Sequence, residues 1–187
     1  LDPDLVYAEL SNYGIDIIRS QFEADSVLFY YKKYFDFPLE GYLQERAMPI
    51  SSPENATYPK FYSYQSSYSI PDLFREIAFN GGLSMQGAKL VGTGTVDNPA
   101  LLDISEKDTV RMRIRTQNIV IREASMNSTS SQVTIKLDGD SIYHPDLDFL
   151  YLEDSDEIRI TKKDIYTSGV PYSNSYHNMN MNFEELS

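Results

Sequence analysis

The chain has 187 residues, no cysteine and a formal net charge of −12. This length suits one domain with its own hydrophobic core. The missing cysteines exclude disulfides, thiol catalysis and thiolate metal sites, and the negative charge disfavours nonspecific binding to nucleic acid or anionic lipid, because phosphates are held by cationic side chains. Since the sequence begins at Leu1 rather than methionine, we expect a single domain over residues 1–187 that is a fragment of a longer chain.

Apolar residues alternate with polar ones along most of the chain, which is the period of half-buried strands. In residues 109–115, for example, Val110, Met112 and Ile114 alternate with three arginines. About a dozen short strands are expected, at the spacing typical of a sandwich or barrel. In chain order they cover residues 13–18, 26–31, 39–43, 60–64, 82–87, 88–94, 100–104, 109–115, 117–122, 131–137, 147–152 and 157–161.

The segments between these strands are rich in turn-forming residues. Residues 47–59 contain three prolines and form the longest predicted loop. Pro71 followed by Asp72 predicts one short helix over residues 71–79. An internal similarity links residues 24–43 with 139–160, since each has Asp-Ser before an aromatic strand, a turn and a second strand. The prediction is an all-β, repetitive stacked-strand architecture (solenoid or β-taco-like), with a two-layer β-sandwich as the alternative.

Three arginines form the first candidate site. Arg111, Arg113 and Arg115 lie on one face of a predicted strand, about 7 Å apart because a strand rises about 3.3 Å per residue. Cross-strand pairing with acids such as Asp146 and Asp148 is the structural interpretation. An anionic glycan or a lipid head group is the functional one.

Tyrosines form the second candidate site, with Tyr62, Tyr64 and Tyr68 in the segment "YPKFYSYQSSY". Aromatic faces pack on sugar rings while tyrosine hydroxyls stay in water. Ordinary cross-strand aromatic pairing accounts for the same residues and is favoured.

The stretch "DGDSIYHPDLDFLYL" contains four aspartates and one of the two histidines. An EF-hand loop starting at Asp138 would require an oxygen ligand at position 5 and glycine at position 6, where Ile142 and Tyr143 stand. A hairpin turn whose carboxylates accept local N–H groups is therefore expected. An irregular calcium site at Asp138 and Asp140 is the alternative, and no other cofactor is predicted.

Catalytic chemistry finds little support in the sequence. His144 and His177 lie outside any metal-spacing motif, which favours structural roles over zinc or iron binding. Ser141, His144 and Asp146 share one segment without a nucleophile elbow. The glycine-rich residues 81–95 match no phosphate-binding loop. We expect a protein that is not an enzyme.

The words "LDPDLVYAEL", "DSVLFYYKKYFDFPLEG", "FNGGLSMQGAKLVGTGT" and "NSYHNMNM", taken in order, resemble a segment of very large uncharacterised exported envelope proteins of Bacteroidetes-type bacteria. The resemblance covers nearly the whole chain. It implies a non-catalytic structural or scaffold module in the periplasm, the outer membrane or at the cell surface, whose partners are neighbouring segments of the same long protein. It carries over no site residues. The rival function, argued from the residues, is a carbohydrate-binding or surface-adhesion module that uses the tyrosines and the arginine face, with glycan or lipid head groups as partners.

Overall fold

A computed structural model describes residues 2–47, 55–162, 169–175, 179–182 and 185–186. These residues contain no α-helix, and their strands join into one large antiparallel sheet, so the predicted all-β class is confirmed. The strands are β1 (Val6–Glu9), β2 (Gly14–Asp16), β3 (Gln21–Tyr31), β4 (Leu39–Arg46), β5 (Lys60–Ser63), β6 (Tyr68–Phe74), β7 (Ile77–Gln86), β8 (Lys89–Thr93), β9 (Ala100–Glu106), β10 (Thr109–Thr116), β11 (Asn118–Arg122), β12 (Ser125–Leu137), β13 (Asp140–Leu152), β14 (Glu157–Thr161), β15 (Tyr172–Asn174), β16 (Met179–Met181) and β17 (Glu185–Leu186).

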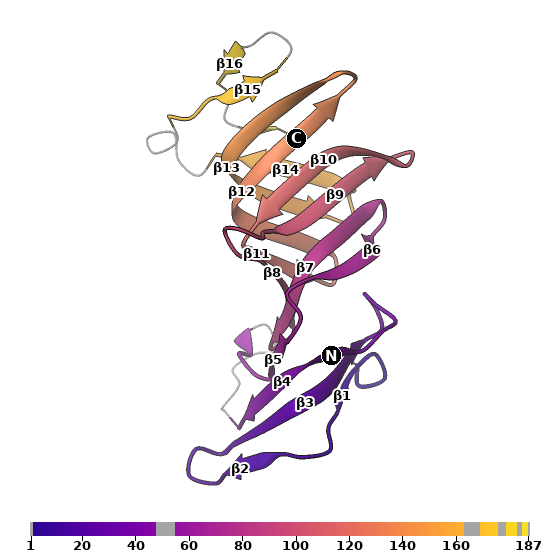
Figure 1. Cartoon of the computed structure of the whole chain (residues 1–187), viewed down its shortest axis with the longest axis vertical. Helices are drawn as coiled ribbons and strands as arrows, with labels where there is room; N and C mark the ends of the chain where they lie inside the picture. Colours follow the sequence, from indigo (N-terminus) through magenta and orange to yellow (C-terminus); the bar gives the residue numbers. More distant parts are fainter. Residues whose placement is uncertain (1, 48–54, 163–168, 176–178, 183–184, 187) are drawn as a thin grey trace.

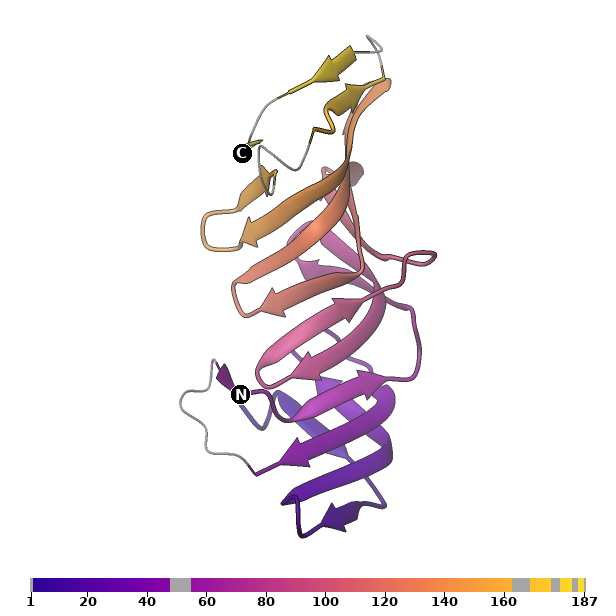
Figure 2. The same ribbon diagram turned by 90° about the vertical axis from the view of Figure 1, so that its left-hand side faces the viewer.

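The hairpins are stacked in sequence order along the long axis of the molecule (Figures 1 and 2). The long strands β3, β7, β12 and β13 each pair with different partners along their two halves, so the sheet folds over into two facing layers. The first layer contains β2, β5, β8, β11, β14 and β17 together with one half of each long strand. β4 spans the bend, because it pairs with β3 on both sides of the bulge. The second layer contains β1, β6, β9, β10, β15 and β16 with the other halves.

Irregular backbone marks the places where the long strands cross between layers. The pairing register of β3 shifts between Ala24 and Val27, and that of β12 shifts after Ser128. Ser26 and Ser130 lie at these shifts with φ of 54° and 57°. A β-bulge adds an unpaired residue and bends its strand, which explains how one sheet supplies both layers.

One continuous hydrophobic core fills the space between the layers. Phe79 of the second layer packs where Gly92 of the first layer has no side chain, and a Cβ at Gly92 would come within 2.5 Å of the Phe79 ring. Phe29 stacks on Phe61 with ring centroids 4.5 Å apart. Tyr34 lies in the turn after β3, and its hydroxyl donates to the carbonyl of Arg122 at 2.9 Å. This packing joins segments nearly ninety positions apart in the sequence.

The molecule is elongated, as the stacked-strand prediction requires. It exposes 11311 Å² of surface, whereas a compact monomer of 21.4 kDa exposes about 9,100 Å². Residues 24–43 and 139–160 both form a hairpin that begins with a long strand. The Asp-Ser pair that they share lies at different places, because Ser26 is at the bulge within β3 whereas Asp140 and Ser141 begin β13.

The helix predicted over residues 71–79 is wrong. β6 ends at Phe74, β7 begins at Ile77, and a tight turn with Glu76 at φ 60° joins them. Pro71 lies where the pairing between β6 and β7 is irregular. Its missing N–H therefore removes no backbone hydrogen bond between these strands. The strands β1, β6, β15, β16 and β17 were not predicted, and most of the predicted loop 47–59 lies outside the described residues.

Candidate functional site

Two of the three arginines on β10 are held by acidic side chains. Arg113 makes a two-pronged pair with Asp103 of the neighbouring strand β9, with N–O distances of 2.6 and 2.7 Å. Arg111 lies 2.9 Å from Asp138 and 3.4 Å from Glu106. The pKa of each guanidinium is raised, mainly by its hydrogen bond to aspartate. The expected cross-strand charge pairing is thus present.

The partners differ from those expected. Asp146 and Asp148 make no ion pair with these arginines within the described part of the chain, and Asp148 instead accepts the N–H of Ser130 at 3.4 Å. Both aspartates belong to β13, which is separated from β10 by β12. The sequence analysis correctly expected acidic side chains beside the arginines. It chose them from β13, which is not adjacent to β10.

Arg115 is the exposed member of the row. It lines a pocket of about 460 Å³ together with Thr95, Asn98, Gln117 and Gln132, which we call the arginine pocket. Gln132 of β12 is its cross-strand partner. Among the described residues, no ion pair involves Arg115. The pocket lining also includes the carboxylate of Asp97. Arg115 can bind the carboxylate of an acidic sugar, while the amides, the hydroxyls and Asp97 can bind its hydroxyl groups.

Tyr62 and Tyr64 are about half exposed, at 48% and 52%. The hydroxyl of Tyr64 donates to Asp25 at 2.5 Å and accepts the N–H of Ser26 at 3.1 Å, so its ring is fixed. Both tyrosines line a second pocket of about 470 Å³, with Ser84, Gln86, Val91, Thr93 and Asn118 among its other residues. We call this the tyrosine pocket. A fixed, half-exposed ring beside amides and hydroxyls is suited to stacking on a sugar.

Tyr68 does not belong to this surface. It is 8% exposed, and its ring stacks on Phe37 with centroids 6.1 Å apart. Burial raises the pKa of its phenol. The reason is the strand period: Tyr68 begins β6 on the face that packs into the core, whereas the exposed tyrosines come from β5 and the residue after it.

The arginine and tyrosine pockets adjoin each other. Thr93 and Asn118 line the tyrosine pocket, while Thr95 and Gln117 line the arginine pocket. Between them the N–H of Gly94 donates to the carbonyl of Gln117 at 2.8 Å. The two pockets therefore have neighbouring residues in their walls, although Tyr62 and Tyr64 come from the first layer and Arg115 from the second.

The acidic segment forms a hairpin turn between β12 and β13, with Gly139 at φ 85°. Asp138 contacts Arg111, while Asp140 accepts the N–H of Ser141 at 2.8 Å and the hydroxyl of Ser175. Within the described ranges, no group of three or more His, Cys, Asp or Glu side chains converges as a metal site would require. The turn itself was predicted correctly, and calcium binding there remains the untested alternative.

His144 is buried between the layers, with 1% of its surface exposed. Its Nδ1 accepts the N–H of Asp146 at 3.1 Å, so Nε2 carries the proton and donates to the carbonyl of Val170 at 3.0 Å. Burial lowers its pKa. Both ring nitrogens are thus bonded to backbone groups and not to Ser141 or a carboxylate. His177 lies outside the described residues.

Asp25, Gln117 and Gln132 were missed by the sequence analysis. No local signal identifies them, because Asp25 is thirty-nine positions from the tyrosine that it holds.

The chain matched no protein-family model, no curated protein and no solved structure. No helix within the described residues has the length and hydrophobicity needed to span a membrane.

Proposed function

We propose that this chain is a non-catalytic structural module of a large exported cell-envelope protein, located in the periplasm, the outer membrane or at the cell surface. The observation that supports the proposal most is the continuous two-layer stack. Its hairpins follow one another along a single axis and share one core. A stack of this kind can be lengthened by adding hairpins at either end, because its strands pair with the next strands along the same sheet. Contacts such as that of Tyr34 with Arg122 also join hairpins that lie further apart. Neighbouring segments of the same long protein are the partners that fit this geometry.

Cell fractionation tests this role. Antibodies raised against the purified chain are used to detect the natural protein in cytoplasmic, periplasmic and outer-membrane fractions. The expected signal lies in the envelope fractions as a species much larger than 21.4 kDa. A cytoplasmic protein of the size of this chain would contradict the proposal.

A carbohydrate-binding or surface-adhesion module is the second candidate, favoured by the adjoining arginine and tyrosine pockets. Their volumes lie in the range of small-molecule sites, roughly 300–1,000 Å³. Tyr62 and Tyr64 supply stacking faces, and Arg115 favours a sugar with a carboxylate.

A glycan array tests this second function. The wild type is compared with Tyr62→Ala and Tyr64→Ala, and Tyr143→Ala is the matched control because its ring is also exposed, at 37%, but lines neither pocket. Binding that is lost in the first two variants and kept in the control supports the site. A wild type that binds no glycan contradicts it.

A further inference from the structure

A third pocket lies where several turns of the stack come together. Its volume is about 580 Å³, and it shares no lining residue with the arginine and tyrosine pockets. It is lined by the N-terminal segment before β1, the end of β3, the turn between β7 and β8, and the turn between β11 and β12. We call it the turn pocket.

The lining of the turn pocket is cationic, although the chain as a whole is acidic. It contains three cations, Lys33, Lys89 and Arg122, and two acids, Asp2 and Glu123, which leaves a formal charge of +1. The whole chain carries −12. Because a concave site lined by one sign of charge concentrates ligands of the other sign, this pocket favours an anion.

Two of the cations lie opposite each other on neighbouring strands. β8 pairs with β11, with Leu90 opposite Ile121, so the next position of this antiparallel register places Lys89 opposite Arg122, with both side chains on one face of the sheet. Like charges directly opposite each other are destabilising. Within the described part of the chain, neither cation makes an ion pair. A negative group bound between them would remove the repulsion.

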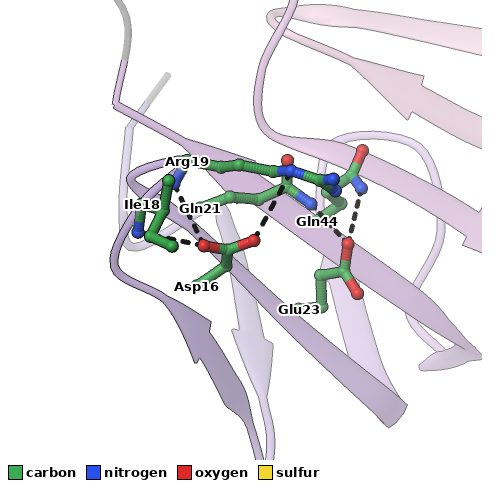
Figure 3. A network of polar contacts seen from close by, with 6 residues as sticks. All are labelled: Asp16, Ile18, Arg19, Gln21, Glu23 and Gln44. Atoms are coloured by element: carbon green, nitrogen blue, oxygen red, sulfur yellow. Dashed lines mark hydrogen bonds and ion pairs between the residues drawn. The ribbon is translucent and has the colours of Figure 1, made fainter.

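Several other cations of the chain have acidic partners. The Arg19 guanidinium lies 3.6 Å from the carboxylate of Asp16, which also accepts the N–H groups of Ile18 and Arg19 at 3.0 Å (Figure 3). Arg113 is paired with Asp103 in the same way. A carboxylate bound in the turn pocket would give its two opposed cations an equivalent partner.

The cationic side of the pocket is held in place by the fold. The carbonyl of Arg122 accepts the hydroxyl of Tyr34 at 2.9 Å, and the Arg122 guanidinium donates to the side-chain oxygen of Asn127. Lys33 donates from Nζ to the carbonyl of Glu123 at 2.6 Å and lies 4.0 Å from the carboxylate of the same residue. Groups that are already ordered lose little conformational entropy when a ligand binds.

The rest of the lining includes apolar residues. Leu5 and Val6 come from the N-terminal segment and Ala88 from the turn between β7 and β8, and Leu5 is 42% exposed. The N–H groups of Leu5 and Val6 donate to the carbonyl of Asp2 at 3.0 and 2.9 Å, and the N–H of Lys32 donates to the carbonyl of Leu5 at 2.9 Å. These bonds fix the apolar segment against the end of β3.

We propose that the turn pocket binds a carboxylic acid with an apolar tail, a medium-chain fatty acid, whose carboxylate lies between Lys89 and Arg122. The tail packs on Leu5 and Val6. A guanidinium matches the geometry of a carboxylate, and a lining charge of +1 balances one negative charge, whereas a phosphate dianion would be repelled by the two acids. The volume lies in the range of small-molecule sites, roughly 300–1,000 Å³. The proposal does not depend on the cell-envelope role.

Isothermal titration calorimetry with simple ligands tests the ligand class. Octanoate should bind at least about tenfold more tightly than acetate, which has the head group without the tail, because each buried methylene group strengthens binding up to about fourfold. Octanoate should also bind at least about tenfold more tightly than octan-1-ol, which has the tail without the charge. Inorganic phosphate should bind more weakly than octanoate.

Substitutions locate the site. Lys89→Gln and Arg122→Gln should each weaken octanoate binding about tenfold, since each removes a hydrogen bond to a charged group, and Leu5→Ser should weaken octanoate binding without changing that of acetate. Arg19→Gln is the matched control, because this arginine is 73% exposed and lines none of the three pockets. Circular dichroism checks that every variant is folded.

Three results would overturn the proposal. They are a wild type that does not bind octanoate up to about 10 mM, a tighter binding of phosphate than of octanoate, and octanoate affinities that are unchanged in both glutamine variants of the pocket. None of these results would affect the fractionation test or the glycan array.

Discussion

Replacing Gly94 with alanine should destabilise the fold where the chain crosses between layers. A Cβ at this position would lie 2.1 Å from the backbone nitrogen of Ala100 and 2.6 Å from the carbonyl carbon of Pro99, so the backbone must move by about 1 Å. That movement is opposed on one side by the hydrogen bond from Gly94 to Gln117 at 2.8 Å. On the other side, Thr95 and Asn98 are joined by two hydrogen bonds of 2.8 and 3.0 Å.

Overpacking of this kind costs about 1–3 kcal/mol. In a chain of this length 1 kcal/mol lowers the melting temperature by about 2–4 °C, so a decrease of about 2–12 °C is expected. Thermal unfolding followed by circular dichroism measures it. Gly14→Ala is the control, because nothing lies within 4 Å of its added Cβ and it should melt like the wild type. Equal melting temperatures for Gly94→Ala and the wild type would refute the packing argument, and with it the fixed wall of the arginine pocket.

Four further measurements test the structure. Small-angle scattering should give a maximum dimension above about 60 Å, since ten strand spacings along the first layer already span about 48 Å; a value near the 41 Å or so of a compact sphere of this length would contradict the stack. The free energy of unfolding should fall as the pH falls below about 6.5, because burial lowers the pKa of His144 and the unfolded chain then binds the extra proton; this slope should disappear in His144→Leu, measured in a background without the second histidine. A double-mutant cycle on Arg113 and Asp103, which remain 33% and 25% exposed, should give a coupling of about 0.5–1 kcal/mol, and a coupling of zero would show that water screens the pair completely. A chelator should leave the melting temperature unchanged, because Asp138 and Asp140 are already engaged by Arg111, Ser141 and Ser175; a lower melting temperature would instead support the calcium site.

The candidate site was predictable as a set of residues but not as an arrangement. The alternation that places Arg111, Arg113 and Arg115 on one face can be recognised within residues 109–115 of the sequence. Which of them is available to a ligand depends on acids from β9 and from the turn after β12, and only Arg115 has no ion pair among the described residues. Tyr68 resembles its neighbours in sequence but faces the core.

The all-β class, the positions of most strands and the turn at Asp138–Asp140 could be predicted from the sequence, because the period of two and turn chemistry are local properties of the chain. It also misassigned residues 71–79, where the helix-start signal at Pro71 was outweighed by the burial of Phe74 and Phe79 in two paired strands. The folded structure was needed to show that the long strands bend to supply both layers, and that Tyr64 and Arg115 line adjoining pockets. These features follow from packing between segments tens of residues apart, and no pattern in a single segment specifies such contacts.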